Sequence, residues 1–236
     1  MTKLLSIQAD AKTTKGDDYG VLTAIQYFAP SDFSGRQVCP FRTTACVKAC
    51  LGVTAGRMVM NSVRKAQIFR TDMYFDDREG YYVQLYKEIT AFEKKAARKR
   101  LIAAVRLNGT SDLPWHKLRF NGQRIFEAFP NVQFYDYSKN YKLFRDYPDG
   151  RVASNYRVVY SIAGDTEDKF AGLVDSVLNA GGLVAASWRG ELPKTYRGFP
   201  VKDGDKHDAI FLRGGGAVLG LKAKGAARKP NEFTLN

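Results

Sequence analysis

Three cysteines gathered in one short segment carry the clearest chemistry in this sequence. Cys39, Cys46 and Cys50 are the only cysteines of the 236-residue chain, and all lie within 12 positions in CPFRTTACVKACLG. The first residues lack the apolar region of a signal peptide, so the thiols are expected to stay reduced, and their odd number argues against a disulfide framework. Three thiolates suit a [4Fe–4S] cluster with one open iron, or a zinc ion completed by a histidine.

The spacing C-x6-C-x3-C favours iron–sulfur over zinc. Structural zinc sites usually pair cysteines two residues apart, a spacing that this segment lacks. Cys46 and Cys50 lie four residues apart, so a helix opened by TACVKACLG would place both thiols on one face. Thr43 or Thr44 is the expected N-cap of that helix. The remaining interpretation is three buried thiols with no chemical role.

Short apolar runs that alternate with helical stretches predict the elements around these cysteines. The expected strands are 20–30, 101–109, 132–139, 156–164, 183–188, 207–212 and 217–224. The expected helices are 58–100, broken near Gly80, 122–130 and 168–182, which ends at Gly181. This alternation predicts an α/β protein with mostly parallel strands, either a (β/α) barrel or partial barrel, or an open doubly wound sheet. We expect a single domain over residues 1–236, with 1–18 as an N-terminal extension and 222–236 as a basic C-terminal tail.

Polar residues follow each predicted strand, where ligands bind in both architectures. The candidates for cofactor contacts are Asn108, Gly109 and Ser187. The candidate catalytic residues are Asp112, Tyr137 and Lys139. Polar loops are common in every α/β protein, so ordinary solvated loops are the alternative.

Carboxylates offer a second chemistry. A divalent-metal nuclease site requires Asp112, Asp136 and Asp203 to converge, since two such metals stabilise the attacking and leaving oxygens. His116 and His207 are the only histidines, so a histidine-rich metal centre is excluded and at most a Cys3His zinc site is open.

The composition favours a polyanionic partner. The formal net charge is +13, and 13 Tyr and 15 Phe accompany it. Basic side chains attract phosphate and aromatic rings stack on bases, so nucleic acid or a nucleotide is the expected partner; a basic surface that serves solubility is the alternative. No apolar run is long enough to span a membrane, which predicts a cytoplasmic protein with no membrane partner.

A three-cysteine loop after the first strand of a β/α barrel resembles the arrangement of radical S-adenosylmethionine enzymes. That superfamily usually has C-x3-C-x2-C, from which this spacing departs. The resemblance implies that Cys39, Cys46 and Cys50 bind a [4Fe–4S] cluster and that S-adenosylmethionine chelates its open iron.

Several stretches together resemble the bacteriophage gene product 88 family. They are CPFRTTACVKACLG, RLNGTSDL, VQFYDYSK and the segment from DGDKHDAIFL to AVLGLKAKG, in this order over 38–225. The resemblance implies a phage origin, hence action in the host cytoplasm, and supports one domain. Extra residues between Gly109 and Asp112 depart from the family pattern.

Overall fold

One sheet organises the protein, and helices surround it. The computed structural model describes residues 2–8 and 11–235. The strands are β1 (Leu5–Ile7), β2 (Val21–Gln26), β3 (Ile102–Arg106), β4 (Gln133–Ser138), β5 (Arg151–Ala153), β6 (Tyr156–Ser161), β7 (Leu183–Trp188), β8 (Thr195–Tyr196), β9 (Phe199–Asp203) and β10 (Ala217–Lys222). Six of them, β2, β3, β4, β6, β7 and β10, lie inside ranges predicted from apolar runs, and those predictions are confirmed.

The strand order follows the chain up to β7 and then runs in reverse through β10, β9 and β8. Hydrogen bonding arranges the strands as β1-β2-β3-β4-β6-β7-β10-β9-β8, with β5 beside β6. From β2 to β9 all neighbouring strands along this path are parallel, whereas β1, β5 and β8 are antiparallel. The expected mostly parallel α/β sheet is therefore confirmed. From β2 to β10 the order lacks the reversal that defines a doubly wound sheet, and among the described residues the end strands β1 and β8 do not pair, so the sheet is open.

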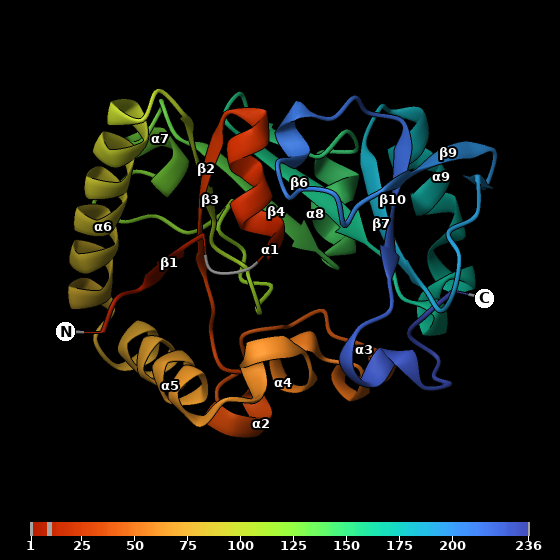
Figure 1. The fold of residues 1–236 in the computed structure, drawn as a ribbon, viewed down its shortest axis with the longest axis horizontal. Coiled ribbons are helices and arrows are strands. Elements are labelled where there is room, and N and C mark those ends of the chain that lie inside the picture. The colour runs from red at the N-terminus through yellow and green to blue at the C-terminus, as the bar shows by residue number, and fades with distance from the viewer. Residues whose placement is uncertain (1, 9–10, 236) are drawn as a thin grey trace.

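Helices and single turns connect the strands. The α-helices are α1 (Ala11–Thr14), α2 (Ser31–Ser34), α3 (Thr44–Lys48), α4 (Leu51–Thr54), α5 (Asn61–Asp76), α6 (Arg78–Arg98), α7 (Ile125–Ala128), α8 (Tyr141–Asp146) and α9 (Ala171–Asn179). The 3-10 turns are η1 (Lys15–Tyr19), η2 (Gly56–Val59), η3 (Gly164–Thr166), η4 (Asp168–Phe170), η5 (Ile210–Leu212) and η6 (Gly225–Arg228). Figure 1 shows α2, α3 and α4 together beneath one end of the sheet. None of the described helices is both long and apolar enough to cross a membrane.

The long helical region predicted over 58–100 divides into two helices at Asp77. The Asp77 carboxylate caps α6 by accepting a hydrogen bond of 3.0 Å from the backbone N–H of Gly80. A Cβ at position 80 would collide with that carboxylate, so glycine permits the cap. The predicted break is confirmed in position, although its cause is the cap and not helix breaking by glycine. The predicted helical stretches 122–130 and 168–182 contain α7 and α9, and Gly181 has the left-handed φ of 79° expected after a helix end.

Two apolar clusters lie on opposite faces of the sheet. Side chains alternate along a strand, so Ala103 and Val105 of β3 join the larger cluster while Ala104 joins the smaller one. The larger cluster includes Leu85 of α6, and the smaller one includes Ile210 of η5. The helices that connect parallel strands thus cover one face, and a single turn covers part of the other.

The strand predicted over 207–212 is wrong. Residues 210–212 form the turn η5, and β10 pairs with β9 instead. Ile210 is fully buried in the smaller cluster, and the buried Asp208 accepts a hydrogen bond of 2.8 Å from the Tyr135 hydroxyl. An apolar run indicates that a segment is buried, but a short buried strand and a buried turn have the same pattern. The wrong prediction has this cause.

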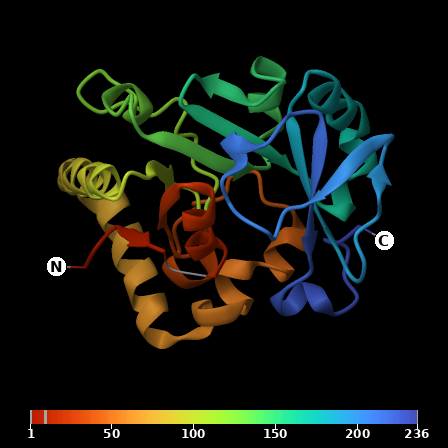
Figure 2. The same ribbon diagram turned by 45° about the horizontal axis from the view of Figure 1, so that its top comes forward.

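Both ends of the described chain pack against the sheet. Residues 1–18, expected to form an extension, contribute the edge strand β1, which pairs with β2. Within the predicted tail 222–236, the N–H of Ala226 donates to the Thr54 hydroxyl at 3.2 Å, and the N–H of Leu235 donates to the Ser187 carbonyl at 2.8 Å. Both views place this C-terminal segment beside α4 (Figure 1, Figure 2).

Candidate functional site

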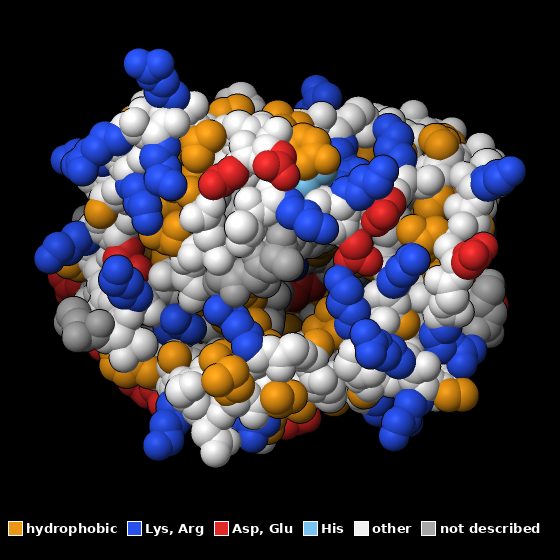
Figure 3. Space-filling view, in the orientation of Figure 1, with side chains coloured by type: hydrophobic (Ala, Val, Ile, Leu, Met, Phe, Trp, Pro, Cys, Tyr) orange, Lys and Arg blue, Asp and Glu red, His pale blue; other side chains and the backbone are white. Residues whose placement is uncertain are grey.

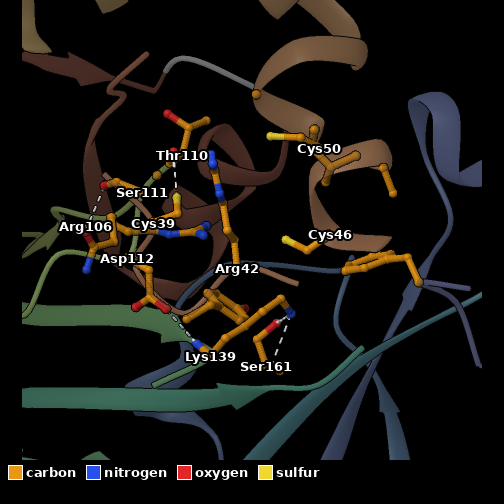
Figure 4. Close-up of a pocket in the computed structure, with 17 residues that line it drawn as sticks. Cys39, Arg42, Cys46, Cys50, Arg106, Thr110, Ser111, Asp112, Lys139 and Ser161 are labelled. Atoms are coloured by element: carbon orange, nitrogen blue, oxygen red, sulfur yellow. Dashed lines mark hydrogen bonds between the residues drawn. The ribbon is translucent and has the colours of Figure 1, made fainter. Parts of the chain in front are cut away.

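A cavity of about 190 Å³ lies at the carboxyl ends of the parallel strands, as predicted. Its walls come from the segment after β2 and from the ends of β3, β4 and β6. We call it the cysteine cavity, because all three cysteines line it together with Arg42, Arg106, Asn108, Gly109, Thr110, Ser111, Asp112, Tyr137, Lys139, Ser161 and Phe233. Figure 4 shows these residues drawn around one space.

The cysteine segment reaches this cavity through a capped turn and a break. The Thr43 hydroxyl caps α3 by accepting a hydrogen bond of 3.0 Å from the Cys46 N–H, which confirms one of the two expected caps. Cys46 lies on α3, but α3 ends at Lys48 and Cys50 is the residue before α4. The prediction that Cys46 and Cys50 share one helix face is therefore wrong, although both thiols line the same cavity.

Cys39, Cys46 and Cys50 form no disulfide. Burial raises the pKa of the Cys39 thiol, and the nearby Asp112 carboxylate and the other two thiols raise it further. Burial also raises the pKa of the Cys50 thiol, with Cys46 adding to the shift. The Cys39 thiol contacts the Thr110 carbonyl at 3.8 Å. These mutual electrostatic effects agree with Figure 4, in which Cys46 and Cys50 project from the helical turns toward the space that Arg42 crosses.

The side chains around the cysteine cavity can be compared with the ligand sets of known metal centres. Among the described residues, no three His, Cys, Asp or Glu side chains are grouped so that they could hold one metal ion. Neither His116 nor His207 lines the cysteine cavity, and the ring of His207 lies 4.1 Å from that of Tyr19. In a [4Fe–4S] cluster each thiolate binds a different iron, so its ligands lie farther apart than around a single ion. The cavity therefore presents three thiols without a histidine beside them, which does not match the donor set of a Cys3His zinc ion.

Asp112 ties the end of β4 to the loop after β3. Its carboxylate accepts hydrogen bonds from the Ser138 hydroxyl at 2.5 Å and from the Lys139 N–H at 2.9 Å. Burial raises the pKa of Asp112 to about 6, against the opposing effect of these two hydrogen bonds. Asp112 thus lines the cavity as predicted and also fixes the backbone of Lys139.

The Lys139 ammonium lies on the far side of the same cavity. It donates to the Ser161 hydroxyl at 3.0 Å and to the Ser161 and Ile162 carbonyls, and it lies 5.1 Å from the centre of the Phe233 ring. Burial lowers the pKa of Lys139, whereas Cys46, Asp112 and other acidic groups nearby oppose that shift. A cation is thereby held next to the thiols.

Tyr137 belongs to a buried network under the cavity. Its hydroxyl donates to Asp208 at 3.3 Å, and the Arg106 guanidinium lies 4.6 Å from the centre of its ring. Arg106 pairs with the other oxygen of Asp208 at 3.3 Å, and Tyr135 donates to that same oxygen. Tyr137 therefore lines the cavity with its ring while its hydroxyl is engaged.

Asn108 and Gly109 line the cavity but serve the fold. Asn108 is only 3% exposed; its amide oxygen accepts from the Ser111 hydroxyl, the Leu113 N–H and the Trp115 indole, and its amide nitrogen donates to the Leu113 carbonyl. A Cβ at Gly109 would lie 2.4 Å from a backbone carbonyl of β2, so only glycine fits there. The Asn108 amide and the Gly109 backbone thus both have structural roles in the loop after β3.

Ser187 lines a neighbouring cavity of about 450 Å³. We call it the apolar cavity after Ile162, Ala185, Ala186, Leu221 and Ala227 in its wall; the charged residues Arg106, Asp205, Lys222 and Lys224 also line it. It shares Leu51, Arg106, Tyr137, Ser161 and Phe233 with the cysteine cavity. Ser187 is therefore separate from the thiols but lies on a surface continuous with theirs.

Two carboxylates of the nuclease hypothesis, Asp112 and Asp136, line one small cavity of about 10 Å³, but Asp203 does not join them there. Asp136 is buried and accepts hydrogen bonds from the Asn108 N–H at 2.7 Å and the Tyr156 hydroxyl at 3.0 Å. Burial raises its pKa to about 7. Asp203 lies on β9, which β6, β7 and β10 separate from β4, the strand of Asp136. Asp136 is best described as a support for the Asn108 loop.

The residues of the cysteine cavity that sequence reasoning missed include two arginines and a phenylalanine. Arg42 stands between two of the cysteines, and Arg106 ends β3 just before Asn108, so position alone was a usable signal for both. Phe233 has no such signal, because only the tertiary fold brings residue 233 to Lys139.

Fold and site together define an α/β protein with a thiol-lined cavity at the carboxyl ends of a mostly parallel sheet. The chain belongs to the Gene product 88 family, a family of phage proteins, whose family model matches residues 3–234. The resemblance to the gene product 88 family that was noted from the sequence is thereby confirmed. A comparison with curated proteins and one with solved structures gave no match.

Proposed function

We propose that this protein is an iron–sulfur enzyme, similar to radical S-adenosylmethionine enzymes, that acts on a nucleotide or nucleic acid in the host cytoplasm. One observation carries the proposal: the only three cysteines of the chain line one cavity at the edge of the sheet where α/β enzymes bind ligands. We also propose that the open sheet, whose strands follow chain order from β1 to β7 with β5 set aside, is a partial barrel.

Cys39, Cys46 and Cys50 would hold the cluster. A cluster bound by three thiolates is anionic, and cations within the same cavity wall would offset that charge. Arg42 and Lys139 both line the cavity and supply such cations. When bound, an open-iron cluster with S-adenosylmethionine supplies hydrogen-atom abstraction from a substrate, which is chemistry of the cofactor.

The apolar cavity would receive the nucleoside part of S-adenosylmethionine. It adjoins the cysteine cavity and combines apolar side chains with the Ser161 and Ser187 hydroxyls and with charged side chains, Asp205 among them, which suits a group with an apolar face and several polar atoms. Tyr137 and Phe233 border both cavities and would place that group against the thiols. Asp112 would act as a positioning residue through the backbone of Lys139.

The test is metal analysis of protein prepared without oxygen and reconstituted with iron and sulfide. We expect a brown protein with about four iron ions per chain. Cys50→Ala should lose most of this iron, whereas His116→Ala should retain it, because His116 lies outside the cavity. A colourless protein with one zinc ion per chain would instead support a structural zinc in a non-catalytic nucleic-acid-binding protein. Magnesium-dependent nuclease activity that Asp112→Asn abolishes would support a nuclease.

A further inference from the structure

A third cavity, of about 640 Å³, opens next to the cysteine cavity. Four cationic side chains line it, and we call it the basic cavity: Arg57, Arg106, Lys224 and Arg228. Figure 3 shows this face hollowed near its centre, with Lys and Arg side chains around the hollow. The hollow opens between α4 and the segment after β10, and most of the wall comes from residues within 51–58 and 224–228.

The protein leaves part of this positive charge unbalanced. Lys224 pairs with Asp205 at 2.6 Å, and Arg106 pairs with Asp208 at 3.3 Å. Asp208 is the one carboxylate on the described wall, and hydrogen bonds from tyrosine hydroxyls also engage it. Arg57 and Arg228 have no carboxylate partner within the described residues, so the cavity carries net positive charge.

Two buried donors in this wall also have no acceptor. The Nε atoms of Arg57 and Arg106 are buried and make no hydrogen bond within the described part of the chain. A buried donor without an acceptor is destabilising, by about 1–3 kcal/mol in general, and a bound water or ion is one way in which such a donor is satisfied. The Arg57 guanidinium lies 5.7 Å from the centre of the Tyr27 ring, which belongs to the same wall.

These observations select a phosphate group as the ligand chemistry. A guanidinium presents a planar pair of N–H donors that matches two oxygens of a phosphate. The cavity is much larger than a phosphate ion and has apolar surface beside the cations, from Ile25, Leu51 and Met58. It also shares Leu51, Arg106, Gly109 and Thr110 with the cysteine cavity, so a molecule anchored there would extend toward the thiols.

We propose that the basic cavity binds the phosphate group of a mononucleotide, recognised by Arg57 and Arg228 with Arg106 at the wall next to the thiols. The inference deepens the proposed function by naming its substrate class, and it rests on that function for the role of the bound nucleotide. The binding itself depends on cations that are separate from the cysteines. It can therefore be measured on protein that contains no metal.

The test is calorimetric titration of the metal-free full chain at low ionic strength with each of the four nucleoside 5′-monophosphates, with adenosine, and with inorganic phosphate. We expect at least one monophosphate to bind, inorganic phosphate to compete with it, and adenosine to bind at least about tenfold more weakly. Arg57→Gln and Arg228→Gln should each raise Kd about tenfold, since each removes a charge-assisted contact.

The matched control is Arg98→Gln, which removes an equal charge from an exposed arginine of α6 outside the cavity. It should leave Kd unchanged. Arg228 is exposed, so its variant should fold normally, and an unchanged thermal midpoint would show this. The proposal is overturned if no monophosphate binds, if adenosine binds equally well, or if Arg98→Gln weakens binding as much as the cavity variants. A single-stranded oligonucleotide that binds when no mononucleotide does would also overturn it.

The same titration separates this inference from the proposed function. Cys50→Ala should bind the monophosphate like the unmodified chain, because Cys50 does not line the basic cavity. Protein that takes up iron but binds no nucleotide refutes the phosphate site alone. Protein that binds nucleotide but takes up no iron refutes the iron–sulfur proposal alone.

Discussion

Replacing Asn108 with alanine tests whether this residue supports the site and does not itself bind a cofactor. In the native protein its amide oxygen accepts from the Ser111 hydroxyl at 2.8 Å, the Leu113 N–H at 3.0 Å and the Trp115 indole at 3.2 Å. All three donors belong to buried residues. The substitution would leave them without this acceptor inside the loop that carries Asp112.

The expected cost follows from that count. Each buried donor left without its partner costs at least about 1 kcal/mol, so the free energy of unfolding should fall by about 3 kcal/mol or more. Urea unfolding followed by circular dichroism measures this change. If the slope of the free energy of unfolding against urea concentration is the same in both proteins, their unfolded states expose similar surface. Asn131→Ala is the matched control, because Asn131 is exposed and should cost less than about 0.5 kcal/mol.

Asn108→Asp refines the same test. Aspartate keeps an acceptor for the three donors but replaces the amide nitrogen, which donates to the Leu113 carbonyl at 3.0 Å and faces Asp136 at 3.5 Å. It should be less damaging than alanine at low pH and more damaging at high pH, where two carboxylates would face each other. A loss below about 1 kcal/mol in Asn108→Ala would refute the assignment of Asn108 to the fold.

Three further outcomes are expected. Burial raises the pKa of Asp136 to about 7, whereas the pKa of an aspartate in the unfolded chain is about 3.9. Between these two pH values the folded state binds more protons than the unfolded state. The free energy of unfolding should therefore fall as the pH rises from about 4 to 7. Asp136→Asn should flatten that dependence in urea unfolding measured across this pH range, and an unchanged slope would contradict the assignment. Thr43→Ala removes the cap on the Cys46 N–H and should cost about 1 kcal/mol, whereas Thr43→Ser should retain most of the stability; equal losses would rule out capping. Gly109→Ala would force a Cβ to within 2.4 Å of the Gln26 carbonyl and should lower the thermal midpoint by several degrees, an effect absent if the backbone can shift freely.

The central strands were predictable from the sequence because they are buried on both faces. Val21–Gln26 and Leu183–Trp188 are buried throughout, so each appears as a mostly apolar run of strand length. β9 was missed because Phe199–Asp203 alternates between half-buried and exposed residues and contains a proline, a pattern that does not stand out from a loop. The edge strands β1 and β8 are too short to produce any pattern.

The site was predictable in its position but not in its internal roles. Residues at the ends of parallel strands must meet at one edge, which brought Asp112, Tyr137 and Lys139 to the cysteine cavity. Side-chain direction is a tertiary property, so the sequence could not reveal that the Asn108 amide turns inward to its own loop. Nor could it reveal that the helix after Thr43 stops before Cys50.

The C-terminal segment determines when the cysteine cavity can be completed during synthesis of the chain. Cys39 and its neighbours leave the ribosome early, but Phe233, which closes the wall beside Lys139, is among the last described residues to be made. One of the hydrogen bonds that hold this segment joins Thr54 to Ala226 across 172 positions of sequence. Contacts of such long range slow folding, because a long loop must close before they form. Throughout synthesis the thiols therefore belong to an unfinished cavity, and a nascent chain cannot present the complete site until translation has passed the final wall residue.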